Sequence, residues 1–191
     1  SVPVKTVAEL IKLAKAKPGV LNYSSSANGS SSHIAGELFK SMANVDIVRI
    51  AYKAGNQEMA DLVAGQVQMS ISSGAQVGAQ LRSGKLRALA TAGAGRSVLF
   101  PDLPTVAESL PGFITESLLV FFAPAKTPEA IVRRLNQETV RALDKPDVRD
   151  RMLKIGQEPA GGTPEQLTEA IKGEMARVGK LIKDGIIKPG D

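Results

Sequence analysis

Two kinds of hydrophobic pattern alternate along the first half of the chain. Short apolar runs, typical of strands, are followed by longer segments in which apolar residues recur at the spacing of one helical face. We expect an opening helix that begins at a Thr6–Glu9 capping box, strands at residues 20–24, 46–52, 67–72 and 86–92, and helices at residues 32–43, 57–64 and 75–83. Strands that alternate with helices favour a parallel sheet with right-handed crossovers. The predicted fold class is therefore α/β, a parallel-sheet lobe with flanking helices.

The second half of the chain has a mainly helical pattern. Residues 93–112 are rich in Gly and Pro and predict an irregular connection. Residues 113–123 are extended and apolar, and we place a crossing between two lobes there. Helices are expected to begin at Pro128 and at Pro164, because the hydroxyl of Thr127 or Thr163 can cap a helix whose first residue is the proline. A shorter helix is expected at residues 147–155. An apolar stripe from Leu167 to Ile182 on the last helix needs a partner surface.

A turn made almost wholly of small hydroxyl residues lies between Tyr23 and His33. Asn28 and Gly29 can adopt left-handed backbone angles at little cost, so successive N–H groups can point at one spot. The helix that follows adds amides without internal partners, which attract a carboxylate or a phosphate. We therefore predict an anion-binding loop, while the alternative is a Ser-rich helix cap without a ligand. The predicted ligand-binding residues of the loop are Ser25, Ser26, Asn28, Gly29, Ser30, Ser31 and His33.

The loops after the next two strands belong to the same rim, because ligands bind beyond the carboxyl ends of parallel strands. Lys53 either offers its positive charge to a carboxylate or is a solvated surface lysine. Ser73 and Gly74 either allow a ligand to approach the backbone closely or simply make a turn. His33, the single histidine, either faces the ligand or is a helix-face residue bonded to its neighbours.

Composition argues against several classes of function. The net charge is +5, but no long basic run occurs and the aromatic residues are five Phe and two Tyr, which argues against a nucleic-acid surface. With one histidine and no cysteine, the chain lacks the residues of a typical zinc site, a thiolate nucleophile or a disulfide. No Gly-x-Ser-x-Gly motif accompanies the serines. We predict no catalytic residue, no metal and no cofactor, and we find no run of residues typical of a signal peptide or a membrane helix.

Further motifs follow the serine-rich turn in a characteristic order. They are Ala51-Tyr-Lys-Ala-Gly55, Ala64-Gly-Gln-Val67, Ser83-Gly-Lys-Leu-Arg-Ala-Leu-Ala90, Pro101-Asp-Leu-Pro-Thr-Val-Ala-Glu108, Pro111-Gly-Phe113 and Phe122-Ala-Pro-Ala-Lys-Thr-Pro128. In this order the chain resembles the Bug-type (TctC-like) extracytoplasmic receptors of the tripartite tricarboxylate transporters, without their N-terminal third. The resemblance implies a type II periplasmic binding protein fold. It makes residues 1–112 the complete second, ligand-binding lobe, and residues 113–191 the crossover strand and C-terminal helices of an incomplete first lobe.

The resemblance also implies a function. It indicates a non-catalytic periplasmic receptor that captures a di- or tricarboxylate, an acidic amino acid or an aromatic acid, with the membrane subunits of a tripartite tricarboxylate transporter as partners. Two alternatives are an α/β enzyme acting on a phosphorylated or carboxylated substrate and a sensory module with the same binding fold. Because the apolar helices would normally cover a sheet whose first strands are missing, we expect the 191-residue chain to self-associate.

Overall fold

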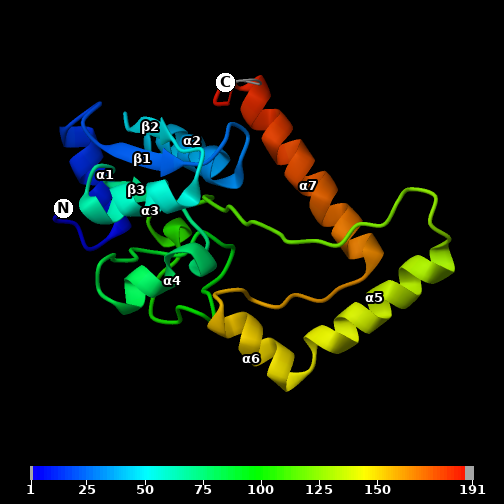
Figure 1. The fold of residues 1–191 in the computed structure, drawn as a ribbon. Helices are drawn as coiled ribbons and strands as arrows, with labels where there is room; N and C mark the ends of the chain where they lie inside the picture. The colour runs from blue at the N-terminus through cyan, green and yellow to red at the C-terminus, as the bar shows by residue number, and fades with distance from the viewer. Residues whose placement is uncertain (1, 188–191) are drawn as a thin grey trace.

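The computed structural model describes residues 2–187, in which a three-stranded parallel sheet lies beside a set of helices (Figure 1). The strands are β1 (Asn22–Ser25), β2 (Val48–Ala51) and β3 (Met69–Ser70), in the spatial order β2-β1-β3. Tyr23 of β1 pairs with Arg49 of β2 on one side and with Met69 of β3 on the other. The parallel sheet with helices between its strands confirms the predicted α/β fold class.

Helices connect the strands and make up most of the C-terminal part. They are α1 (Val7–Ala16), α2 (Ser31–Ala43), α3 (Gly55–Ala64), α4 (Gly74–Arg82), α5 (Glu129–Leu143), α6 (Pro146–Lys154) and α7 (Pro164–Lys183), with a short 3-10 helix, η1, at Val106–Glu108. At the start of α1, the Glu9 N–H donates to Thr6 Oγ1 (3.1 Å), so the predicted cap forms. Helix α2 ends at Ala43, and its C-cap residue Asn44 takes the left-handed conformation with φ of 50°.

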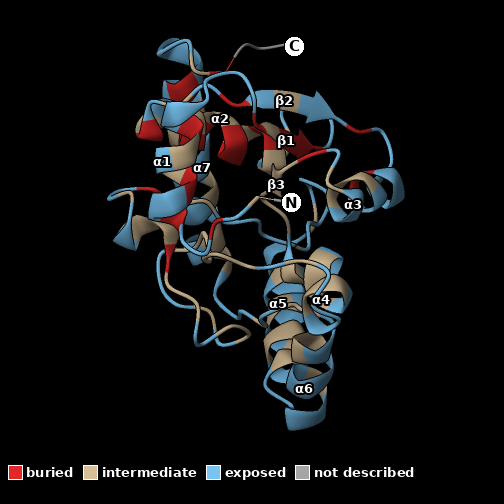
Figure 2. Ribbon diagram, turned by 90° about the vertical axis from the view of Figure 1, so that its left-hand side faces the viewer, coloured by how far each residue is buried: buried red, intermediate tan, exposed pale blue. Residues whose placement is uncertain are grey.

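The hydrophobic core lies where α1 and α2 pack beside the sheet, and most of the buried positions gather there (Figure 2). Tyr23 and Phe113 are almost completely buried, and the Phe113 ring meets the Phe39 ring edge to face, with centroids 6.0 Å apart. Helix α2 can approach β1 closely because Gly36 has no side chain: a Cβ atom there would lie 2.1 Å from Tyr23 Cε2. This packing fixes where α2 starts, and with it the end of the serine-rich loop.

The prediction of a fourth strand at residues 86–92 was wrong. Only Thr91 makes a strand-like contact there, an isolated parallel bridge to Thr105. Pro101 and Pro104 lie in the segment beside it and have no N–H to donate, so a longer ladder with that segment cannot form. The region nevertheless packs against the core through Leu89, Ala90 and Ala92.

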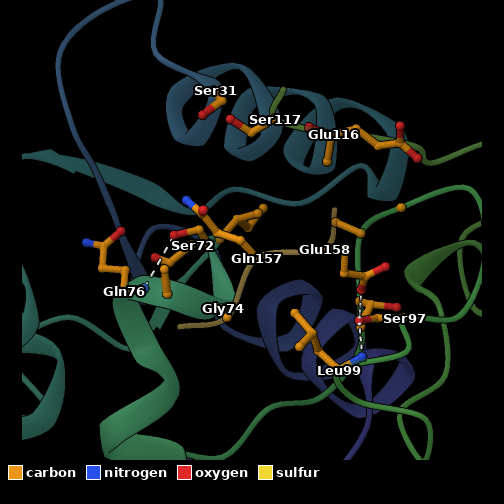
Figure 3. Close-up of a pocket in the computed structure, with 18 of the residues that line it drawn as sticks. Ser31, Ser72, Gly74, Gln76, Ser97, Leu99, Glu116, Ser117, Gln157 and Glu158 are labelled. Atoms are coloured by element: carbon orange, nitrogen blue, oxygen red, sulfur yellow. Dashed lines mark hydrogen bonds between the residues drawn. The ribbon is translucent and has the colours of Figure 1, made fainter. Parts of the chain in front are cut away.

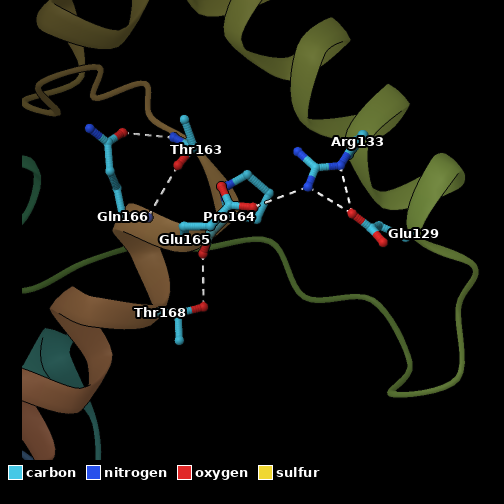
Figure 4. Close-up of polar contacts among 7 residues, drawn as sticks. All are labelled: Glu129, Arg133, Thr163, Pro164, Glu165, Gln166 and Thr168. Carbon is cyan, nitrogen blue, oxygen red and sulfur yellow. Dashed lines mark hydrogen bonds and ion pairs between the residues drawn. The ribbon is translucent and has the colours of Figure 1, made fainter.

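The C-terminal part is mainly helical, as predicted, and follows an irregular segment at residues 113–123 that crosses the molecule (Figure 1). Thr163 caps α7 through mutual hydrogen bonds with Gln166, and Pro164 occupies the first turn (Figure 4). The predicted start of α5 was wrong by one residue. Pro128 is itself the N-cap, because the Thr127 N–H closes a turn onto Pro124 O (2.9 Å).

Helix α7 contacts other parts of the chain at both of its ends. Near its start, Arg133 of α5 forms ion pairs with Glu129 (2.7 Å) and with Glu165 of α7 (3.4 Å), as Figure 4 shows. All three side chains are exposed, so these pairs contribute little to stability. At the other end Leu181 enters the core, whereas Met175 in the middle of the predicted stripe remains 69% exposed. None of the described helices combines the length and the hydrophobicity that a bilayer-spanning segment requires.

Candidate ligand-binding site

The serine-rich loop, residues 26–30, joins the carboxyl end of β1 to the N-terminus of α2. The neighbouring strands end at the same level, because Ser25 pairs with Ala51 of β2 and Ser24 pairs with Ser70 of β3. The loops that follow the three strands therefore leave one edge of the sheet, where parallel sheets bind ligands.

Side chains of the loop and of α2 hold the loop backbone in place. The Ser26 N–H donates to Ser32 Oγ (3.1 Å), and the His33 N–H donates to Ser30 Oγ (3.3 Å). The Ser30 N–H closes a turn by donating to Ala27 O (3.1 Å). These hydrogen bonds within the chain fix the conformation of the loop backbone.

Four amides of this region have no acceptor among the described residues: those of Ala27, Asn28, Ser31 and Ser32. Ser31 and Ser32 form the first turn of α2, where amides lack intrahelical partners and the helix dipole places partial positive charge. An anion at this position would satisfy the amides and would gain from the dipole.

Gly29 has a φ of 75°, the left-handed conformation that its sequence position predicted. A Cβ atom built on Gly29 meets nothing within 4 Å, so only the backbone conformation, and not the available space, disfavours other residues. Asn28 is not left-handed, since Asn44 is the only non-glycine residue with positive φ in the described part of the chain. The Asn28 side chain instead accepts a hydrogen bond from Arg49.

His33 is 5% exposed at the start of α2. Its Nδ1 atom accepts a hydrogen bond from the Gly29 N–H (3.1 Å). The ring therefore supports the loop from within the fold, which matches the helix-face alternative. The Gly29 amide is used by this contact and does not point at a ligand.

Arg49 of β2 holds the loop from the adjacent strand and was not among the residues predicted from the sequence. Its Nε donates to Ser25 Oγ (2.6 Å), its Nη1 to Asn28 Oδ1 (2.5 Å) and its Nη2 to Ser26 O (3.0 Å). A planar guanidinium can fix three acceptors at once in this way, which a lysine cannot do. One signal in the sequence was available, because Arg49 is a charged residue between the apolar pairs Ile47-Val48 and Ile50-Ala51 of the predicted strand.

The other predicted site residues follow β2 and β3. Lys53 is exposed and lies outside the hollow that borders the loop. Ser73 Oγ caps α4 by accepting from the Gln76 N–H (3.4 Å). Gly74 is approached closely by another part of the chain, because a Cβ atom there would lie 3.1 Å from Gly156 O. The small residue at this position thus accommodates the segment that follows α6.

A broad hollow of about 2620 Å³ borders the loop and the start of α2. Ser31 of α2 and Ser117 of the crossing segment lie on one side of it, while Ser72, Gln76 and Gln157 lie together across from them (Figure 3). Both the sheet-bearing part and the C-terminal part contribute to its walls.

Hydrogen-bond donors are the main chemical feature of the loop and of the first turn of α2. Among residues 2–187 no group of three or more His, Cys, Asp or Glu side chains is arranged to hold a metal ion. Backbone amides and hydroxyls, with one guanidinium behind them, suit the binding of a carboxylate or a phosphate.

Known structures and sequences resemble this chain closely. The structure of R. palustris Rpa4515 with adipate has a TM-score of 0.88 at 36% identity, covering 98% of this chain and 63% of that chain. MatC (Rpa3494) from Rhodopseudomonas palustris with bound malate has a TM-score of 0.74 at 31% identity, covering 92% of this chain and 61% of that chain. The UPF0065 protein in the tcbD-tcbE intergenic region of Pseudomonas sp. (strain P51) is 36% identical over 180 residues, covering 93% of this chain.

The chain spans about half the length of that curated relative, 54% of it. Residues 1–186 match the family described as "Tripartite tricarboxylate transporter family receptor". The match covers nearly the whole sequence and confirms the resemblance seen in its motifs. The chain belongs to the tripartite tricarboxylate transporter receptor family, TctC.

Proposed function

We propose that this chain is the ligand-binding part of a non-catalytic periplasmic receptor for a small carboxylate. The observation that carries the proposal is a set of four amides, two in the serine-rich loop and two in the first turn of α2, that lack an acceptor within the described residues; Ser31 and Ser32 of this set line the large hollow. The two structural neighbours with adipate and malate support it, because both ligands are dicarboxylates.

One carboxylate of the ligand would accept hydrogen bonds from the amides of Ala27, Asn28, Ser31 and Ser32. These donors belong to the backbone and are already in place, so binding needs no rearrangement of side chains. Arg49 would hold the loop in this conformation and add positive charge behind it. The remainder of the ligand would occupy the hollow.

We propose residues 1–112 as the ligand-binding second lobe and residues 113–191 as the crossover segment and C-terminal helices of an incomplete first lobe. Closure of two lobes would seal the ligand from water, and the receptor would deliver it to membrane subunits of a tripartite tricarboxylate transporter. Contacts from one lobe alone supply only part of the binding energy, so we expect the 191-residue chain to bind in the millimolar range.

The enzyme alternative has less support from the described residues. The only histidine is buried, accepts a hydrogen bond from Gly29 and is not among the residues that line the hollow. A sensory module would bind its ligand in the same way and would differ in its protein partner.

A thermal-shift titration with adipate, malate and citrate tests the proposal. A ligand that binds the folded state raises the melting temperature, and the rise grows with the logarithm of one plus the ratio of its free concentration to its dissociation constant. Gly29→Val should remove this shift because valine disfavours a φ of 75° and the loop must change, whereas Ser31→Ala should keep it.

Gly185→Val is the matched control for the valine substitution. Gly185 has a φ of 71° and also has nothing within 4 Å of a built Cβ atom, but it follows α7 instead of lying in the loop. The control should lose stability to a similar extent and keep the ligand-induced shift. Equal shifts in Gly29→Val and in the wild type would show that the site is elsewhere.

A further inference from the structure

Glu58 is a buried carboxylate near the proposed binding site, and its negative charge has no evident role in binding an anion. It is 4% exposed in the first turn of α3, beside the carboxyl ends of β1 and β3. Its Oε1 accepts from Ser24 Oγ (2.9 Å) and from Ser70 Oγ (3.3 Å), and its Oε2 accepts from Gln76 Nε2 (3.2 Å). Within the described part of the chain it has no ion-pair partner, so neutral donors hold its charge.

A carboxylate can only accept hydrogen bonds, so Glu58 fixes the direction of each bond around it. Ser70 uses its single hydroxyl proton to donate to Glu58. In the hydrogen bond between Ser70 Oγ and Ser72 Oγ, the proton must therefore come from Ser72. The Ser72 oxygen is then left with lone pairs only, and it lies on the wall of the hollow (Figure 3).

Gln76 is oriented by the same carboxylate. Its Nε2 faces Glu58, because turning the amide around would place two acceptors against each other. The Gln76 Oε1 atom has no partner among the described residues, and the side chain is exposed on the wall of the hollow beside Ser72 (Figure 3). Ser72 and Gln76 together offer acceptor oxygens on this wall.

The hollow thus has two chemically different sides. The start of α2 offers amide donors at Ser31 and Ser32, while the wall formed by Ser72 and Gln76 offers acceptors whose orientation depends on Glu58. An acid that carries a hydrogen-bond donor on its carbon chain can satisfy both sides, and an acid without one leaves the acceptors unpaired.

We propose, building on the carboxylate-receptor function, that Glu58 is a specificity-determining positioning residue. It acts through Ser72 and Gln76 and selects acids that bear a hydroxyl or an ammonium group over acids of the same length that lack one. Glu58 itself does not touch the ligand, since it is buried beneath these side chains.

Succinate and malate are the probes that test this, because they share a carbon chain and a charge and differ by one hydroxyl group. Their dissociation constants for the 191-residue chain are measured by following amide resonances in ¹H–¹⁵N NMR spectra, which detect millimolar binding. The wild type should bind malate roughly three- to tenfold more tightly than succinate.

Glu58→Gln should reduce this ratio to near one, because an amide can donate as well as accept. Ser70 would then no longer have to donate to residue 58, and either serine could donate in the Ser70–Ser72 hydrogen bond. The ratio is the readout, since removing a negative charge changes the affinity for both dianions alike. Asp61→Asn is the matched control: Asp61 is also on α3 but accepts from Tyr52 Oη (2.9 Å), outside the hollow. It should keep the wild-type ratio.

Ser72→Ala provides a second test that does not disturb the buried carboxylate, and it should also lose the preference for malate while binding succinate as the wild type does. Equal binding of the two acids by the wild type, or an unchanged ratio in Glu58→Gln and Ser72→Ala, would overturn the role of Glu58 and leave the receptor function standing. If neither acid, nor adipate or citrate, shifts any loop resonance, the receptor function itself is wrong.

Discussion

At the scale of single residues, the site depends on two charged side chains that reach β1 from different elements. Arg49 of β2 binds Ser25, and Glu58 of α3 binds Ser24, the residue before it. Successive residues of a strand point to opposite faces, so the two charges hold the end of β1 from both sides of the sheet. The conformation of the serine-rich loop, which follows β1, therefore depends on the hydrogen bonds of Arg49 to Ser25 and of Ser24 to Glu58.

Replacement of Arg49 tests this geometric role. Arg49→Lys and Arg49→Met should both weaken binding of malate by roughly tenfold, because neither side chain can make the three guanidinium hydrogen bonds to Ser25, Ser26 and Asn28. Arg133→Lys is the control, because Arg133 of α5 pairs with Glu129 and Glu165 and makes no contact with the serine-rich loop. Dissociation constants from NMR titrations with malate decide the matter: if lysine fully replaces Arg49, the residue acts through its charge alone.

The two tyrosines predict how stability depends on alkaline pH. Burial and then a hydrogen bond to Asp61 raise the pKa of Tyr52 to about 12 from 10.0, and burial with a hydrogen bond to Glu37 raises the pKa of Tyr23 further. Both phenols keep their protons more tightly in the folded state, so their contribution to stability is complete below pH 10 and falls as the pH rises above it.

Ultraviolet absorbance reports this directly, because the chain has two Tyr and no Trp. Tyrosinate should form only together with the loss of helical circular dichroism, well above pH 10. Tyrosinate that forms near pH 10 in a chain that stays folded would contradict the burial of both side chains.

How far the sequence predicts the site depends on the distance between partners along the chain. The Ser-rich turn and its cap involve neighbours, so Gly29 and Ser30 could be placed from local patterns. Arg49 and Glu58 could not, because their partners lie 24 and 34 residues away in Ser25 and Ser24. A local pattern shows that a residue is charged, and only the fold shows which acceptor or donor it meets.

At the scale of elements, the same difference separates helices from strands. The helix starts at Thr6 and Thr163 were predicted correctly because a cap is a contact with the next turn. Strands β1, β2 and β3 are all shorter than predicted, and residues 86–92 form none, because a strand exists only where a neighbour pairs with it. The apolar pattern of those residues reports burial and not hydrogen bonding.

A pair of glycine substitutions tests the packing of α2 on β1. Gly36→Ala should destabilise the fold by about 2 kcal/mol, because the new methyl group would overlap the Tyr23 ring. Gly173→Ala in α7 should instead stabilise it by about 0.5–1 kcal/mol, since nothing lies within 4 Å and alanine is the better helix former. Urea unfolding gives both values, and effects of equal sign would contradict the close approach of α2 to β1.

At the scale of the whole molecule, apolar side chains are exposed outside the core. Leu119, Phe121 and Phe122 of the crossing segment are 81%, 84% and 76% exposed, and Ile131 and Leu135 of α5 are at least half exposed. Large apolar side chains this accessible rarely cluster on the surface of a soluble monomer. They support the expectation that the chain associates with itself or with another surface of matching character.

Light scattering of the purified 191-residue chain tests that expectation. The mass should exceed 20.1 kDa and rise with concentration, and a double Phe121→Ser, Phe122→Ser variant should shift toward the monomer because it removes the most exposed aromatic pair. A wild-type chain that remains a monomer at all concentrations would show that these side chains do not cause association.

The central claim is that the start of α2 binds a carboxylate, and a residue-by-residue NMR titration with malate tests it most directly. The amide resonances of Ala27, Asn28, Ser31 and Ser32 should move most, since these amides have no acceptor among the described residues, and the Gly29 amide should move less because it donates to His33. Gly29→Val should abolish the response and Gly185→Val should keep it. Saturable shifts that concentrate elsewhere, or a spectrum that malate, adipate and citrate all leave unchanged, would contradict the account.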